Sequence, residues 1–181
     1  HDLSELVNDL LDLAKIEAGK VELTIAPVDI DNLFSTLKGM LRPLTRNPGV
    51  ELVFVTPPAP PPLWSDEAKV AQILRNFISN ALKFTEAGQV AVAFEDDGGE
   101  HVTFAVSDTG IGIEADNLQL IFEEFSQIAH PLQAGAKGTG LGLPLCRQLA
   151  QLLGGSVEVA SAPGAGSTFS LHLPRRAEGA P

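Results

Sequence analysis

The sequence predicts an α+β domain preceded by one separate helix, and two patterns carry this prediction. Apolar residues recur at spacings of three and four in several segments, as on the buried face of an amphipathic helix. Between those segments, short runs place apolar residues at alternate positions, which is typical of strands that lay one face on a core. With 181 residues, 44% of them hydrophobic, the chain suffices for one domain of ordinary size with an appendage.

The composition excludes several classes of protein. A net charge of -11 with only 12 Lys and Arg argues against a nucleic-acid surface, which needs clustered cations. The single cysteine, Cys146, excludes an intrachain disulfide and a cysteine zinc cluster, and it fits a reducing cytoplasm. It falls in an apolar helical pattern, so we expect a small core residue. No signal peptide and no run of about 18 apolar residues occurs. Because the first residue is His1, we expect a piece of a longer protein.

The first predicted helix has an unusually apolar surface. Leu3, Leu6, Leu10 and Leu13 follow one another at 3-4-3 spacing, and Gly19 is placed to end the helix. Two readings stay open from spacing alone. The helix packs on its own domain, or it is part of a helical bundle whose partner is another helix or another copy.

A second helix is expected from Asp29, ended or kinked by Pro43, after a short extended piece. A strand at 50–55 and an extended surface connection at 57–62, with five prolines in six residues, follow it. Trp64 is expected to re-enter the core. The apolar side of this helix would comprise Leu33, Phe34, Leu37, Met40 and Leu41.

The segment from Asp66 to Thr85 predicts a long helix with an uncommon polar face. Its apolar positions are Val70, Ile73, Leu74, Phe77, Ile78, Ala81 and Leu82. Opposite them lie Gln72, Asn76, Ser79, Asn80 and Lys83. Asparagine is a poor helix former, so two asparagines one turn apart suggest that they are present for a binding role rather than for helix stability. Their amide oxygens suit a hydrated Mg²⁺ that also binds phosphates, which Lys83 could reach. The alternative is a polar face that merely contains asparagine.

Two alternating runs, at 90–94 and 102–106, predict an antiparallel hairpin that delivers Asp108 to the end of its second strand. The stretch from Asp108 to Ile113 contains Gly110 and Gly112, which permit positive φ or close approach of a ligand. A ligand-binding turn is one reading and an ordinary tight turn the other.

The remaining chain predicts a lid, a helix and two strands. Leu118, Ile121, Phe122 and Phe125 indicate a short helical turn packed in the core. Residues 126–137 lack periodicity and lead through glycines 138–142 into a helix, as a phosphate-covering lid would. Gly154 and Gly155 end this helix, strands follow at 156–161 and 168–173 with a turn at 163–166, and the tail is expected to fray.

Taken together, five of these segments resemble the catalytic ATP-binding domain of sensor histidine kinases, in the superfamily of the gyrase, Hsp90 and MutL ATPases. Residues 75–85 resemble the N box, 108–112 the first G box, 122–125 the F box, 138–142 the second G box and 164–169 the last glycine turn. The resemblance covers residues 21–174, with 175–181 as the tail. Residues 10–19 are similar to the end of the second dimerisation helix, which assigns residues 1–20 to a truncated dimerisation bundle.

The resemblance implies an α/β sandwich, the Bergerat ATP-binding fold, in which three helices cover one face of a mixed, largely antiparallel sheet. It implies Asn80 as the principal Mg²⁺ ligand with Asn76 assisting, Lys83 and Lys137 as phosphate contacts, and Asp108 as acceptor for the adenine amine. Further nucleotide contacts would come from Phe84, Gly110, Gly112, Ile113, Phe125, Gly138, Thr139, Gly140, Leu141, Gly142, Leu143 and Thr168.

The implied activity is transfer of the ATP γ-phosphoryl group to a histidine of the dimerisation domain, for relay to a response-regulator aspartate in a homodimeric, cytoplasmic kinase, whether or not its parent is anchored in a membrane. The acceptor histidine is not expected in this chain. His1 lies too close to the Leu-Leu-Asp-Leu segment, and His101, His130 and His172 are expected on the surface. The chain should therefore bind Mg-ATP without phosphorylating itself.

Two other classes stay open. A clamp ATPase of the gyrase or Hsp90 kind would carry a catalytic glutamate where this chain has Asn76. A nucleotide-sensing docking module would keep the fold and act by binding a partner.

Overall fold

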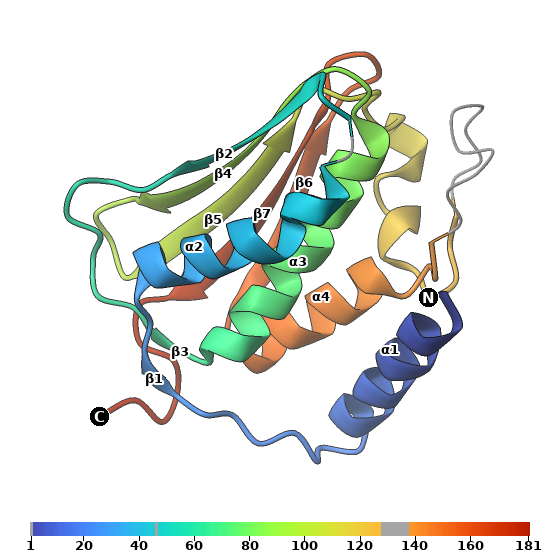
Figure 1. Cartoon of the computed structure of the whole chain (residues 1–181). Coiled ribbons are helices and arrows are strands. Elements are labelled where there is room, and N and C mark those ends of the chain that lie inside the picture. Colours follow the sequence, from blue (N-terminus) through green and yellow to red (C-terminus); the bar gives the residue numbers. More distant parts are fainter. Residues whose placement is uncertain (1, 46, 128–137) are drawn as a thin grey trace.

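The computed structural model describes residues 2–45, 47–127 and 138–181 (Figure 1). His1, His130, Lys137 and most of the predicted lid therefore lie outside the described residues. The helices are α1 (Asp2–Glu17), α2 (Ile30–Leu41), α3 (Glu67–Phe84) and α4 (Gly142–Leu152), with 3-10 turns η1 (Arg42–Leu44), η2 (Ala115–Asn117) and η3 (Leu120–Phe122). Over these ranges, every helix is too short or too polar to cross a membrane.

Five strands form one sheet in the order β2-β4-β5-β7-β6. They are β2 (Val50–Val55), β4 (Gly88–Asp96), β5 (His101–Asp108), β6 (Ser156–Ser161) and β7 (Ser167–Pro174). Only β2 and β4 run parallel, so the predicted mixed, largely antiparallel sheet is confirmed. A separate two-stranded ladder joins β1 (Ala26–Pro27) to β3 (Trp64–Ser65).

Helices α2, α3 and α4 lie on one face of the sheet, and the core fills the space between the two layers (Figure 1). Phe77 of α3 and Phe104 of β5 are fully buried there. Cys146 is buried as well, as predicted, and burial raises the pKa of its thiol, which makes it unreactive. The three-helix layer of the predicted sandwich is confirmed.

Two aspartates cap the N-termini of α2 and α3. The side chain of Asp29 accepts a hydrogen bond from the Asn32 amide at 3.0 Å, and that of Asp66 from the Lys69 amide at 3.1 Å. These are helix N-caps, which satisfy amides that have no partner within the helix. Asp66 also accepts from the Thr24 amide at 2.9 Å, which fastens the chain before α2 to the start of α3.

Two core predictions in the first half of the chain are wrong. Met40 is 50% exposed, because it lies at the rim of the apolar stripe in the last turn of α2. Trp64 is only half-buried, and its neighbour Leu63 enters the core instead. Successive side chains of an extended segment point in opposite directions, so Leu63 points inward and Trp64 outward, where the Arg176 guanidinium lies 5.7 Å from its ring.

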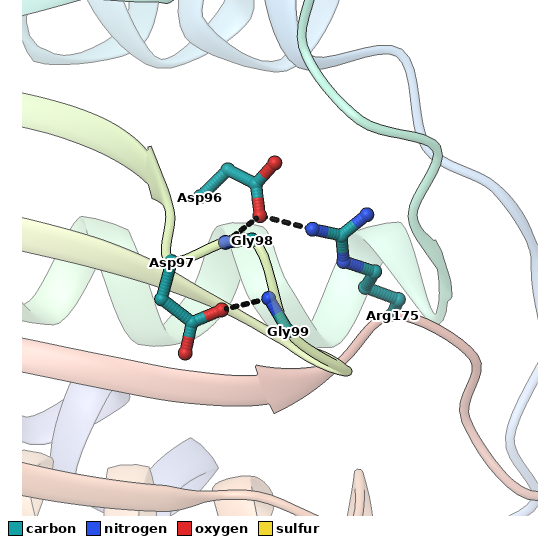
Figure 2. A network of polar contacts seen from close by, with 5 residues as sticks. All are labelled: Asp96, Asp97, Gly98, Gly99 and Arg175. Carbon is teal, nitrogen blue, oxygen red and sulfur yellow. Dashed lines mark hydrogen bonds and ion pairs between the residues drawn. The ribbon is translucent and has the colours of Figure 1, made fainter.

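The C-terminal tail, residues 175–181, was predicted to fray, but its first residues contact the rest of the domain. The Arg175 amide donates to the Glu100 carbonyl oxygen, and Arg175 pairs with Asp96 of the β4–β5 hairpin (Figure 2). The Ala177 amide donates to the Trp64 carbonyl oxygen, and Ala177 is buried. The reason is that residues 175–177 continue past β7 and satisfy backbone groups of two neighbouring segments.

Candidate functional site

Asp108 lies half-buried at the end of β5. Its Oδ1 accepts a hydrogen bond from the Gly110 amide at 2.8 Å. Burial raises the pKa of the Asp108 carboxyl, and backbone hydrogen bonds from Gly110 and Ser167 oppose that rise. The strand end thus presents a partly desolvated carboxylate whose orientation is fixed by the turn that follows it.

The glycines after Asp108 are required by close packing of backbones. A Cβ at Gly110 would lie 3.0 Å from the carbonyl carbon of Phe84 and still closer to its oxygen. Gly112 has φ +74°, and a Cβ there would lie 2.7 Å from the carbonyl carbon of Ala162. Residues 108–113 are therefore pressed between the end of α3 and the β6–β7 turn, which accounts for both glycines, and ligand binding by this turn stays a prediction.

The polar ridge of α3 faces the second glycine motif. A Cβ at Gly142 would lie 2.8 Å from Asn76 Oδ1, and a Cβ at Gly138 would lie 3.2 Å from Lys83 Nζ. Asn80 is half-buried on the same helix between these two residues. Side chains there would fill the space beside the amide and the ammonium, so these glycines keep the ridge accessible.

The N-terminus of α4 lies beside this ridge. Leu141 is its N-cap and provides no side-chain hydrogen bond, so the first turn is not capped in the usual way. Thr139 Oγ1 accepts from the Leu141 amide at 3.2 Å. Helix N-termini carry partial positive charge and amide donors, which suit anionic oxygens. Pro144 in the first turn is compatible with this, because it removes no helical hydrogen bond.

Among the described residues, no group of three or more His, Cys, Asp or Glu side chains is arranged to hold a metal ion. The asparagine amide oxygens of α3 are instead neutral ligands of the kind that Mg²⁺ accepts when phosphates supply the remaining oxygens. The donor set therefore fits a metal that arrives with a nucleotide.

Helix α1 contributes polar contacts that the sequence did not indicate. Asp9 Oδ2 accepts from Thr139 Oγ1 at 3.2 Å, and Asp12 Oδ2 accepts from Gln72 Nε2 at 2.9 Å. Burial raises the pKa of Asp9, while the Thr139 hydrogen bond and the charge of Arg75 lower it. The only available signal was two aspartates three apart on one helix, which is common on solvated faces.

Thr168 and Phe125, two predicted nucleotide contacts, differ in orientation or burial from what the sequence pattern indicated. Thr168 points away from the helices, where its Oγ1 contacts Ser107 Oγ at 2.9 Å, because alternation along β7 places buried Ser167 on the inner face. Ser167, which was not among the predicted contacts, pairs with Asp108 in the sheet and lies on the inner face beside it. Phe125 is 59% exposed with φ +59°, so its predicted packing in the core is wrong. It lies against Gly140, whose carbonyl oxygen accepts from the Phe125 amide.

The other predicted residues that the structure describes are at the site or beside it. Lys83 Nζ lies 5.4 Å from the ring centre of half-buried Phe84. The Ile113 amide donates to Ser161 Oγ at 2.8 Å. Gly140, Gly142 and Leu143 are half-buried around the start of α4, where Leu141 is fully buried. His101 is exposed, and His172 lies on the outer face of the sheet, hydrogen-bonded to Thr103 and Glu158, as expected for surface residues.

A mixed sheet covered by three helices, with a carboxylate, two glycine motifs and an asparagine ridge at one end, defines a nucleotide-binding ATPase fold. The sequence profile described as "Histidine kinase-, DNA gyrase B-, and HSP90-like ATPase" matches residues 65–177, and the chain belongs to this family. Within the family, the chain is similar to the catalytic ATP-binding domains of two-component sensor histidine kinases.

Three relatives illustrate this. The virulence sensor protein BvgS of Bordetella bronchiseptica is 46% identical over 182 residues, covering 96% of this chain and 14% of BvgS. The aerobic respiration control sensor protein ArcB of Escherichia coli is 39% identical over 181 residues, covering 97% and 23%. The crystal structure of full-length ShkA in complex with AMPPNP superposes with a TM-score of 0.85 at 36% identity, covering 99% of this chain and 37% of ShkA. The chain thus spans well under half of each of these three proteins.

Proposed function

We propose that this chain binds Mg-ATP and donates the γ-phosphoryl group to a histidine on the dimerisation domain of its parent kinase. The observation that carries the proposal is the meeting of the α3 ridge with the second glycine motif, where Asn76 and Lys83 lie against Gly142 and Gly138. Phosphoryl transfer asks a protein mainly for positioning and charge neutralisation. A lysine, amide oxygens and a helix N-terminus supply both.

Asp108 would select the base. An ionised carboxylate accepts hydrogen bonds only, so it pairs with the exocyclic amine of adenine. Guanine presents a carbonyl at that position, and two acceptors would then be buried against each other, which costs free energy and rejects GTP. Gly110 and Ser167 would hold the carboxylate in place for this contact through the backbone bonds that they already make to it.

Asn80, assisted by Asn76, would hold the metal, and Lys83 with the α4 amides would hold the phosphates. Bound Mg-ATP supplies the transferable phosphoryl group. The amide side chains are uncharged, so they would coordinate the cation and leave its positive charge to be balanced by the phosphates. Lys137, outside the described residues, remains a predicted second phosphate contact.

The partners would be the parent protein's own dimerisation domain, in a homodimer, and the receiver domain of a response regulator in the cytoplasm. A clamp ATPase is disfavoured because Asn76 stands where that class carries its catalytic glutamate. A docking module without kinase activity would share the fold, so the experiment must separate binding from transfer.

Calorimetric titration of this chain with a non-hydrolysable ATP analogue, with and without Mg²⁺, tests binding. We expect adenine-selective binding in the micromolar range that Mg²⁺ strengthens, no binding of the GTP analogue, and at least a tenfold loss in Asp108→Asn. Thr168→Ala is the matched control, because its hydroxyl lies on the opposite face of the sheet. Absence of binding to folded protein would refute the proposal.

Phosphoryl transfer is tested separately by adding the parent's dimerisation domain with radiolabelled ATP. Label on that domain's histidine, lost in Asn80→Ala, supports the kinase. Tight binding with no label would instead favour the docking module.

A further inference from the structure

Ser161, the last residue of β6, begins a row of three polar side chains that crosses the sheet. The β6–β7 ladder pairs Ser161 with Ser167, and the β5–β7 ladder pairs Ser167 with Asp108. Paired residues on adjacent strands place their side chains on the same face of the sheet, roughly 5 Å apart. The row therefore leads from Ser161 through buried Ser167 to the carboxylate of the candidate site.

The Ser161 hydroxyl contacts both glycine turns at this end of the sheet. Its oxygen accepts a hydrogen bond from the Ile113 amide at 2.8 Å. It also lies 2.9 Å from the Gly166 carbonyl oxygen and 2.7 Å from Ser167 Oγ. Ile113 belongs to the turn that follows Asp108, whereas Gly166 belongs to the β6–β7 turn. One hydroxyl thus connects the two turns.

The hydrogen-bonding capacity of serine determines the direction of each of these bonds. A hydroxyl has one proton and two lone pairs, and a carbonyl oxygen only accepts. Ser161 satisfies all three partners if it donates to Gly166 and accepts from the Ile113 amide and the Ser167 hydroxyl. The Ser167 proton then points along the row toward β6 and away from Asp108. The Asp108 carboxylate therefore keeps lone pairs for a donor on a ligand.

Gly166 and Ser167 also contact Asp108 through their backbones. Gly166 has φ +78°, and a Cβ there would lie 2.9 Å from the Asp108 carbonyl carbon. The Asp108 carboxylate accepts a backbone hydrogen bond from Ser167. A displacement of the β6–β7 turn would therefore move both the backbone and the carboxylate of Asp108.

We propose that Ser161 is a positioning residue for adenine recognition, which directs the Ser167 proton away from Asp108 and holds the β6–β7 turn against it. The inference rests on the proposed function, in which the Asp108 carboxylate accepts from the adenine amine. Without the Ser161 hydroxyl, the Ser167 proton turns to Asp108 and competes with that amine, because an ionised carboxylate is a stronger acceptor than a neutral group. Ser161 acts through its neighbours rather than on the nucleotide.

The test compares two variants of nearly equal shape. Ser161→Thr keeps the hydroxyl and Ser161→Val replaces it with a methyl group, and both side chains are β-branched, which suits a strand. Calorimetry measures binding of two ligands to each protein. One is the non-hydrolysable ATP analogue, and the other is the same analogue with hydrogen in place of the exocyclic amine. The ratio of the two affinities measures how strongly the protein recognises the amine.

We expect the wild type and Ser161→Thr to prefer the ligand with the amine by about tenfold or more, because the hydrogen bond is made to a charged group. In Ser161→Val this preference should fall below about threefold, as for a weakened bond. The amide proton resonance of Ile113 should move upfield in Ser161→Val alone, since its acceptor is lost. Ser156→Ala, exposed at the other end of β6, is the matched control and should keep the wild-type preference.

The ratio separates positioning from damage to the fold, because damage weakens both ligands alike. An unchanged ratio in Ser161→Val, or a reduced ratio in Ser161→Thr, would overturn the inference. Ser161→Ala, which adds no methyl group, gives the same comparison if valine disturbs the ¹⁵N amide spectrum beyond the two turns. Folded wild-type protein that binds neither ligand would refute the proposed function and this inference with it.

Discussion

Replacing Gly112 by alanine tests whether close backbone packing shapes the Asp108 turn. Gly112 has φ +74°, and its Cα faces the backbone of Ala162 in the β6–β7 turn. Gly164 in that same turn is the matched control, because its φ is +76° but nothing lies within 4 Å of where its Cβ would be. The Gly164 amide also donates to the Ile111 carbonyl oxygen at 2.8 Å, so both glycines belong to one contact.

The expected losses of stability in Gly112→Ala and Gly164→Ala differ only by the steric clash at Gly112. Alanine at a left-handed φ costs roughly 1–2 kcal/mol, offset by about 0.4–1 kcal/mol because the unfolded chain loses freedom. At Gly112 the new Cβ would lie 2.7 Å from the Ala162 carbonyl carbon. Carbon atoms pack at roughly 3.5–4.0 Å, so the turn must retreat by about 0.8 Å or more. Overpacking of this kind adds roughly 1–3 kcal/mol to the loss of stability.

Urea and thermal unfolding followed by circular dichroism measure the difference. In a domain of this size each kcal/mol shifts the midpoint by roughly 2–4 °C, so Gly112→Ala should unfold about 2–12 °C below Gly164→Ala. Gly112→Ala should also weaken binding of the ATP analogue, because a shift of the turn displaces the Asp108 carboxylate. Equal midpoints for the two variants would refute the inference that backbone contact, rather than φ, makes Gly112 necessary.

Three further outcomes follow from the other contacts. Leu13→Ala should lower the free energy of unfolding of the protein by about 2–3 kcal/mol, because Leu13 on α1 is only 4% exposed. Leu3→Ala should lower it by almost nothing, because Leu3 is 74% exposed, and chemical denaturation measures both changes. Asp9 has a raised pKa, so its contribution to stability is fully present below 3.8 and is lost as the pH rises through the folded value; unfolding free energy against pH should show this dependence in the wild type and not in Asp9→Asn. Arg175→Met should cost at most about 1 kcal/mol by thermal unfolding, since the pair with Asp96 is partly exposed, and a larger loss at low than at high salt would show that the charge matters.

Periodicity predicted the layers of the fold well, because burial of one face governs both helices and strands. The α3 stripe and the β4–β5 alternation appear in the structure as the sequence indicated. Errors occurred at the rims, where an apolar residue has two possible environments. Met40 lies in the last turn of α2 and Phe125 lies beyond the end of η3, and both are exposed, which local spacing alone does not reveal.

Candidate-site residues were predictable where the residue types differ from those that an ordinary helix or turn prefers, as with the asparagines of α3 and the glycines after Asp108. They were not predictable where the choice of residue depends on strand parity. Ser167 and Thr168 are chemically similar and adjacent, and only the register of β7 against β5 decides which one faces Asp108. A shift by one residue reverses every side chain on a strand, so the motif alone could not choose between them.

Helix α1 combines the two readings that its spacing left open. One face packs on the domain, since Leu13 is buried and Leu6 and Ile16 contact the core. The other face keeps large apolar side chains exposed, namely Leu3, Val7, Leu10 and Leu11. An amphipathic helix that served only its own domain would present polar residues there, because exposed leucine gains nothing in water. The excess apolar width is explained if a second helix covers the outer face, so dimerisation through α1 stays a prediction. The inner face meanwhile places Asp9 on Thr139. A helix held between a partner and the second glycine motif would transmit its displacement directly to residues predicted to contact phosphate.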